Sequence, residues 1–137
     1  MLLPHGALVA VVDGAGLELY RNSGNDVAPE LSPMKAPNLD EHSKDAGARH
    51  RSSSANPDGH QGEEDAHAAA VTDWLNQQVL THNIAHLVVI AAPRTLGEMR
   101  RRYDKTLEAV LIGELHKDLI GRPEQAILAA LQGAEAR

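Results

Sequence analysis

The first third of the chain alternates short apolar runs with turn residues. Residues 7–12 form a continuous, valine-rich apolar run that stops at the Asp-Gly dipeptide of 13–14, a sequence typical of tight hairpin turns. Residues 17–20 form a short, partly alternating run that breaks at the Asn-Ser-Gly tripeptide of 22–24. The two runs predict an antiparallel pair of strands. Residues 29–35 predict a third strand, and their two prolines place it at the edge of a sheet.

The second half of the chain changes to longer elements. Apolar side chains recur at helical spacing from Ala68 to Val79, which predicts a helix that begins at Gly62, has acidic residues in its first turn and ends near Asn83. Residues 86–92 are almost continuously apolar, as is typical of a parallel strand buried on both faces.

Two further helices and a strand complete the expected elements. A helix follows Pro93, with Leu96, Met99 and Tyr103 on one side, and a short turn capped by Thr106 contains Leu107. Residues 110–115 predict the next strand. A last helix begins at Pro123, a residue favoured in the first helical turn, and directs Ile127, Leu128 and Leu131 inward.

The resulting order, β-β-β-α-β-α-β-α, predicts an α/β fold of three layers. Two or three antiparallel strands precede right-handed βαβ units, so we expect a mixed five-stranded sheet with helices on both faces. This order matches the ribonuclease-H-like layout. Residues 1–137 are expected to form a single α/β domain. No run approaches the roughly 20 apolar residues of a membrane span, and the N-terminus lacks the features of a signal peptide, so we expect a cytoplasmic protein.

A polar stretch from 40 to 65 interrupts the apolar pattern. Its apolar side chains, apart from one proline, are all alanines. Such a segment buries too little apolar surface to offset its ordering entropy, so we expect a long, mobile loop here. Arg49, His50 and Arg51 give the loop a local positive charge.

Composition narrows the possible functions. The net charge of −6 disfavours nucleic-acid binding through overall charge, although a local basic patch remains compatible with it. Trp74, Tyr20 and Tyr103 are the only aromatic residues, which disfavours base-stacking platforms for single strands. The chain has no cysteine, and therefore no thiolate nucleophile and no cysteine-type zinc site.

The carboxyl ends of the predicted parallel strands carry candidate binding residues. In open α/β sheets, ligands bind beyond these strand ends. Asp13 follows the first strand, Arg94 follows the strand over 86–92, and Lys117 and Asp118 follow the strand over 110–115. The four side chains are therefore expected to converge on one edge and to form a phosphate or carboxylate site. The alternative is that Asp118 caps a turn and the two cations are simply solvated.

The most concentrated positive charge is the run Arg100-Arg101-Arg102. Clustered arginines contact RNA phosphates, whereas the alternative is that they stabilise the C-terminal end of a helix. Metal chemistry is not expected. A ribonuclease-H-type centre needs carboxylates on several strands, but the strand over 86–92 ends without one. The spacing of His42, His50, His60 and His67 also matches no metal motif, so we predict neither a metal nor a cofactor.

Several segments together resemble a known bacterial family. They are Val-Val-Asp-Gly-Ala at 11–15, Tyr-Arg-Asn at 20–22, Ala-Ala-Pro-Arg-Thr-Leu-Gly-Glu-Met-Arg at 91–100 and His-Lys-Asp-Leu at 116–119. The chain is similar to the family named for proteins required for attachment to host cells. This resemblance implies a relation to the middle domain of archaeal and eukaryotic class-one release factors, which also has the ribonuclease-H-like layout. The Gly-Gly-Gln tripeptide of those factors is absent here.

We therefore predict a non-catalytic binding module that acts through ribosomal RNA or a protein partner. The expected contacts are Arg94, Arg100, Arg101, Lys117 and the segment 49–51. The alternative is a small enzyme for a phosphorylated or nucleotide substrate, in which Asp13 is a base or metal ligand and Arg94 and Lys117 clamp the anion. A homodimer through the alanine-rich helix over 66–80 or through an edge strand is a third possibility.

Overall fold

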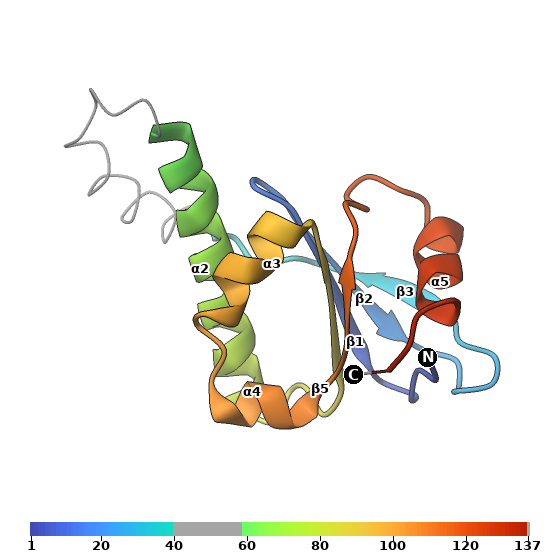
Figure 1. The fold of residues 1–137 in the computed structure, drawn as a ribbon. Helices are drawn as coiled ribbons and strands as arrows, with labels where there is room; N and C mark the ends of the chain where they lie inside the picture. Colours follow the sequence, from blue (N-terminus) through green and yellow to red (C-terminus); the bar gives the residue numbers. More distant parts are fainter. Residues whose placement is uncertain (40–58, 137) are drawn as a thin grey trace.

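Helices cover both faces of a five-stranded mixed sheet (Figure 1). The computed structural model describes residues 1–39 and 59–136. Within them the elements are β1 (Leu8–Val12), β2 (Leu17–Asn22), β3 (Leu31–Met34), α2 (Gly59–Leu80), β4 (Leu87–Ala91), α3 (Pro93–Arg100), α4 (Lys105–Val110), β5 (Leu111–His116) and α5 (Glu124–Gln132).

The strand order β3-β2-β1-β4-β5 confirms the predicted fold class. β1 is antiparallel to β2 and parallel to β4, and β5 is parallel to β4. The two central strands, β1 and β4, are buried along their whole length, as their continuous apolar runs predicted. The proline-containing β3 lies at one edge of the sheet, as expected. This is the ribonuclease-H-like arrangement.

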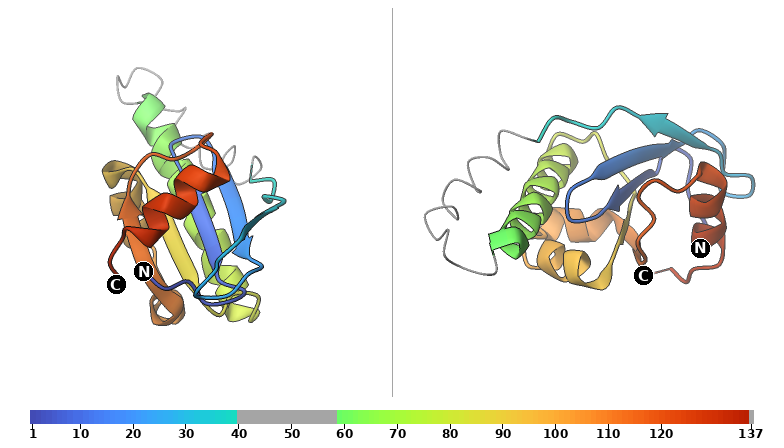
Figure 2. Two further views of the ribbon diagram at one scale, coloured as in Figure 1. Left: turned by 90° about the vertical axis from the view of Figure 1, so that its right-hand side faces the viewer. Right: turned by 90° about the horizontal axis from the view of Figure 1, so that it is seen from above.

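Alternate side chains of the central strands enter two separate cores. Leu8, Ala10 and Val12 pack under α2, α3 and α4, whereas Val9 and Val11 pack under α5. Figure 2 shows these two helical layers on opposite faces of the sheet. The three aromatic residues divide between the cores: Trp74 and Tyr103 pack against the α2 side, while Tyr20 is buried on the α5 side.

A β-bulge in β5 determines which side chains reach each core. The pairing with β4 shifts between Leu111 and Gly113, so that Leu111 and Glu114 both face the α2 side although they are three residues apart. Leu115 consequently enters the core under α5. Gly113 faces α5 as well, and the Met1 side chain fills the space that a β-carbon would need there. The bulge thus places the carboxylate of Glu114 next to α3.

Several boundaries differ from the predictions. α2 begins at Gly59 and not at Gly62, so residues 59–65 are helical and the acidic residues do not lie in its first turn. The helix ends at Leu80, and the left-handed residue that follows is His82, with φ of 62°, and not Asn83. The backbone N–H of Asn83 donates to the carbonyl of Gln78, which closes the helix end.

The region after α3 also differs in detail. α3 ends at Arg100, so Tyr103 lies in the turn that follows and not on the helix. The expected short turn around Leu107 is a six-residue helix, α4, with Asp104 at its N-cap position instead of Thr106. In α5, Ile127 is buried as expected.

Candidate nucleic-acid interface

The topology places the predicted strand-end residues at one edge of the sheet. Asp13 follows β1, Arg94 lies in the first turn of α3 directly after β4, and Lys117 and Asp118 follow β5. Because β1, β4 and β5 are mutually parallel, these positions share the carboxyl edge. Asp13 has its hydrogen bonds within the turn after β1 and Arg94 lies near Asp65, so the convergence of the four side chains on one ligand stays a prediction.

Asp13 holds the turn between β1 and β2. Its Oδ1 accepts hydrogen bonds from the backbone N–H groups of Ala15, at 2.9 Å, and of Gly16. The first half of α2 packs on the same turn, because Nε2 of His67 lies 3.0 Å from the Gly16 carbonyl oxygen and donates to it. A β-carbon on Gly14 would lie 2.8 Å from the Glu64 side chain. The carboxylate of Asp13 therefore stabilises the conformation of this turn.

Arg94 is an exposed cation at this edge. Its side chain is 63% exposed, and its Nη2 lies 4.0 Å from Oδ2 of Asp65 on α2, at the outer limit of an ion pair. Lys117 and Asp118 are both exposed. An exposed pair at this distance contributes little to stability, so the Arg94 guanidinium is available to another anion.

The arginines around α3 fall into two classes, and Arg100 and Arg102 form the engaged class. Nε and Nη2 of Arg100 each lie 3.1 Å from a carboxylate oxygen of Glu114. Arg102 donates to Asp73 in the same two-pronged manner, at 3.1 and 2.7 Å. These hydrogen bonds raise the pKa of both guanidinium groups above their usual value. Paired in this way, the two side chains connect α3 to β5 and to α2.

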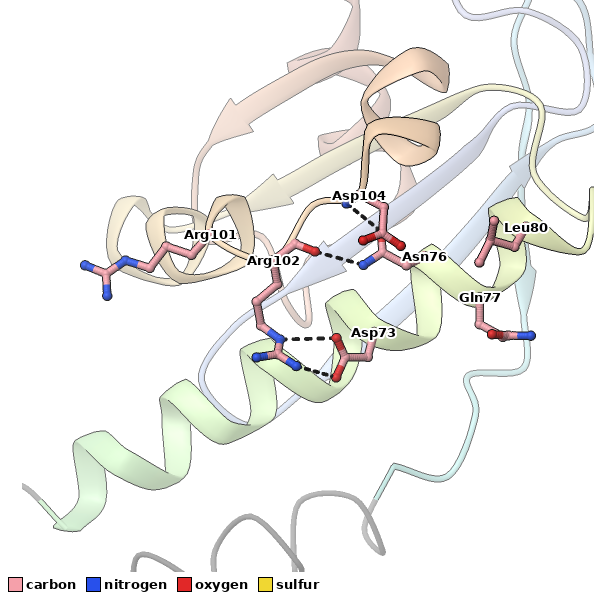
Figure 3. A pocket seen from close by; sticks show the side chains of 7 residues that line it. All are labelled: Asp73, Asn76, Gln77, Leu80, Arg101, Arg102 and Asp104. Atoms are coloured by element: carbon pink, nitrogen blue, oxygen red, sulfur yellow. Dashed lines mark hydrogen bonds and ion pairs between the residues drawn. The ribbon is translucent and has the colours of Figure 1, made fainter.

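Arg94 and Arg101 form the available class. Arg101, the C-cap residue of α3, is 77% exposed, and its Nη1 lies 3.5 Å from Oε1 of Glu98, three residues earlier in the chain. Seven residues separate Arg94 from Arg101, which is about two turns of an α-helix, so both lie on the same side of α3. In Figure 3 the Arg101 side chain points away from Arg102. We refer to Arg94 and Arg101 as the α3 arginine pair.

A groove of about 370 Å³ lies between α2 and the turn after α3 (Figure 3). The Asn76 side chain, which lines the groove, has hydrogen-bond partners within the protein. The Asn76 side chain donates to the Arg102 carbonyl at 2.9 Å and accepts from the Asp104 backbone N–H at 3.1 Å. Among the described residues, no buried side-chain nitrogen or oxygen lacks a hydrogen-bond partner. The hydrogen bonds of Asn76 in this groove therefore hold the segment between α3 and α4 against α2.

The structure does not locate one group of predicted contacts. Arg49, His50 and Arg51 lie outside the described residues. Within 1–39 and 59–136, no group of three or more histidine, aspartate or glutamate side chains is arranged to hold a metal.

Sequence reasoning missed the carboxylates that pair with the arginines. Glu114 is the one charged residue in the otherwise apolar run from Val110 to Leu115, and a lone carboxylate in such a strand is a signal for a buried cationic partner. Asp73 and Asp65 carry no comparable signal, because charged residues are common on the exposed face of a helix.

These features define a ribonuclease-H-like α/β fold with an exposed arginine pair on the helix after its central strand. Residues 6–131 match the bacterial archaeo-eukaryotic release factor family 12, and the chain belongs to this family. The match confirms the relation to release factors that the sequence resemblance implied. A search of the curated proteins found no match. No helix in the described part of the chain combines the length and apolar character that crossing a membrane requires.

Proposed function

We propose that the protein is a release-factor-like binding module that associates with the ribosome through backbone phosphates of ribosomal RNA. Family membership supports the link to translation. We choose the surface because only some of the arginines around α3 are engaged by carboxylates. Arg94 and Arg101 are 63% and 77% exposed and share one side of α3, whereas Arg100 and Arg102 are engaged by carboxylates.

The ion pairs of Arg94 with Asp65 and of Arg101 with Glu98 are weak enough for a phosphate to replace the carboxylates. Exposed ion pairs contribute roughly 0.2–1 kcal/mol, so a phosphate replaces Asp65 or Glu98 at small cost. Arginine binds phosphate through two parallel N–H donors, which adds both strength and orientation. The net charge of −6 repels RNA at long range, so binding must come from this local surface and must weaken as salt is raised.

Lys117 and the segment 49–51 are proposed as further contacts of the same partner. Lys117 lies at the carboxyl edge that also carries Arg94, and Asp13 and Asp118 follow strands that end at the same edge. Arg100 is assigned chiefly to its pairing with Glu114. Because the Gly-Gly-Gln tripeptide is absent, we propose binding without peptidyl-tRNA hydrolysis. The enzyme alternative and a role in host attachment stay predictions, and an effect on attachment would be indirect, through translation.

Co-sedimentation with purified ribosomes tests the proposal. The wild-type protein should pellet with ribosomes at low salt and less at moderate salt. Arg94→Ala/Arg101→Ala should lower the affinity at least about tenfold and reduce the slope of log affinity against log salt by about 1.4 to 1.8, because two phosphate contacts are lost. Its melting temperature should stay within about 2 °C of wild type, since exposed pairs stabilise little.

The matched control removes the same charge elsewhere. Lys35 follows β3 and Lys105 begins α4, and both are exposed. Lys35→Ala/Lys105→Ala should keep nearly full ribosome binding. Absence of binding at low salt, or an equal loss in this control, would overturn the assignment of the surface.

A further inference from the structure

Gly97 is a glycine in the middle of α3 that the fold does not require. Other glycines have a visible structural reason. Gly6 and Gly121 have φ of 82° and 79°, and a β-carbon on Gly24 or Gly113 would clash with a neighbouring residue. Gly97 lies in a helix, and a β-carbon there would meet no other atom within 4 Å. Glycine lowers the stability of a helix relative to alanine, so nothing in the described part of the protein explains its presence at this position.

Three arginines surround Gly97 on the surface of α3. Residues three and four positions apart are neighbours on a helix surface. The neighbours of Gly97 are therefore Pro93, Arg94, Arg100 and Arg101. Arg101, the C-cap residue, keeps helical backbone angles, with φ of −65° and ψ of −20°. Because Gly97 is itself exposed, the backbone of the helix is accessible between the three arginine side chains.

The exposed cations on this face of α3 extend farther into the solvent than the carboxylates beside them. Arg94 is 63% exposed against 34% for Asp65, and Arg101 is 77% exposed against 26% for Glu98. Both ion pairs are weak, because exposed pairs are screened by water and salt. An anion that approaches Gly97 therefore meets two guanidinium groups and little carboxylate surface.

The side chains around Gly97 suit a phosphate backbone and not a base. None of the four neighbours is aromatic, and the three aromatic residues of the chain pack against the two cores, so no ring is placed to stack on a base here. Arginine binds phosphate through paired N–H donors. Glycine allows a ligand to come close to the protein backbone, because it has no β-carbon.

We propose that the sugar–phosphate backbone of ribosomal RNA passes directly over Gly97, so that Arg94 and Arg101 bind phosphates on either side of it. This inference rests on the proposed function and adds the position at which the RNA comes closest to α3. A side chain at residue 97 would hold the RNA away from the helix and lengthen both arginine contacts. The absence of a side chain at this position thus serves binding at the expense of helix stability.

Two uncharged substitutions test the inference by co-sedimentation with ribosomes and by binding to protein-free ribosomal RNA. Gly97→Ala should lower both affinities about threefold and Gly97→Leu at least about tenfold, because the RNA loses its close phosphate contacts. Alanine and leucine favour a helix more than glycine does, so the melting temperature of both variants should rise by about 2–4 °C. Weaker binding together with higher stability would exclude damage to the fold as the cause.

Ala129→Leu is the matched control. Residue 129 is exposed on α5, which covers the opposite face of the sheet, and this change also adds an uncharged side chain to an exposed helical position. It should leave both affinities unchanged. An equal loss of binding in Ala129→Leu would overturn the inference, because added bulk would then act without regard to its position.

The remaining outcomes separate the inference from the proposed function. If Gly97→Leu binds like wild type while Arg94→Ala/Arg101→Ala binds less, the inference fails and the proposed function stands. If Gly97→Leu loses ribosome binding but wild type does not bind protein-free RNA, a ribosomal protein is the occupant and the inference is wrong. Absence of wild-type binding to ribosomes would overturn both.

Discussion

Replacing Glu114 with alanine should destabilise the protein by about 2 kcal/mol. The carboxylate is 10% exposed and accepts hydrogen bonds from Arg100 and from the Tyr103 hydroxyl, the latter at 3.0 Å. A hydrogen bond from a half-buried hydroxyl to a charged acceptor is worth about 1.5 kcal/mol. The Arg100 side chain is 47% exposed, so its pairing is discounted for solvent screening to about 0.5 kcal/mol.

Asp73→Ala is the matched control for this prediction. Asp73 accepts the same two-pronged hydrogen bonds from Arg102, but both side chains are about half exposed, at 54% and 48%. Its loss should cost no more than about 0.5 kcal/mol. Urea unfolding followed by circular dichroism measures both variants, and the difference corresponds to a melting temperature about 5 °C lower for Glu114→Ala.

A double-mutant cycle and a pH series refine the prediction. Tyr103→Phe combined with Glu114→Ala should show a coupling energy of about 1 kcal/mol. Hydrogen bonding to Glu114 raises the pKa of Arg100, so this guanidinium's contribution is fully present below the usual arginine pKa. It is lost only as the pH rises through the raised pKa, so stability between about pH 6 and 9 should not change on its account. Equal costs for Glu114→Ala and Asp73→Ala would refute the reasoning.

Three further predictions concern backbone conformation and a buried phenol. Gly97→Ala should stabilise the protein by about 0.5–1 kcal/mol, because Gly97 is helical and a β-carbon there would meet no other atom. Gly24→Ala should destabilise it by more than about 2 kcal/mol, because its β-carbon would clash with the Ala28 carbonyl. Thermal unfolding compares the two variants. His82→Gly should add about 0.5–1 kcal/mol by removing the strain of a left-handed residue, and an unchanged urea midpoint would contradict this. Burial, followed by repulsion from nearby carboxylates, raises the pKa of Tyr20 above its usual 10.0, so stability should fall as the pH rises above 10 and through the raised pKa, and Tyr20→Phe should flatten that fall in alkaline urea titrations.

The sequence predicts the fold well where one physical signal dominates. The continuous apolar runs of β1 and β4 identify central strands, because no other common element buries both faces over so few residues. The prolines of residues 29–35 identify an edge strand, because proline has no backbone N–H to donate to a neighbouring strand. The start of α2 at Gly59 has no such signal, since its first residues, Gly-His-Gln-Gly, neither favour a helix nor cap one.

The candidate surface depends on contacts that local patterns do not contain. The sequence locates the cluster Arg100–Arg102, but the roles of its members follow from distant carboxylates such as Asp73, 29 residues before Arg102. Glu114 reaches Arg100 only because the bulge in β5 turns it toward α3. A regular strand would direct it to the opposite face, since side chains alternate with a period of two. Such a shift of one residue is not visible in the hydrophobic pattern of so short a strand.

The division of the aromatic residues between the two cores provides a spectroscopic tool. Trp74 is the only tryptophan, and it packs on α2 against the core on that side of the sheet. Its fluorescence therefore reports whether α2 is seated on the sheet. Tyr20 lies in the other core under α5, so the part of the near-ultraviolet circular dichroism that is lost in Tyr20→Phe reports on that layer. Coincident transitions of the two signals would show that both layers detach in one cooperative step, and separate transitions would reveal which layer loosens first.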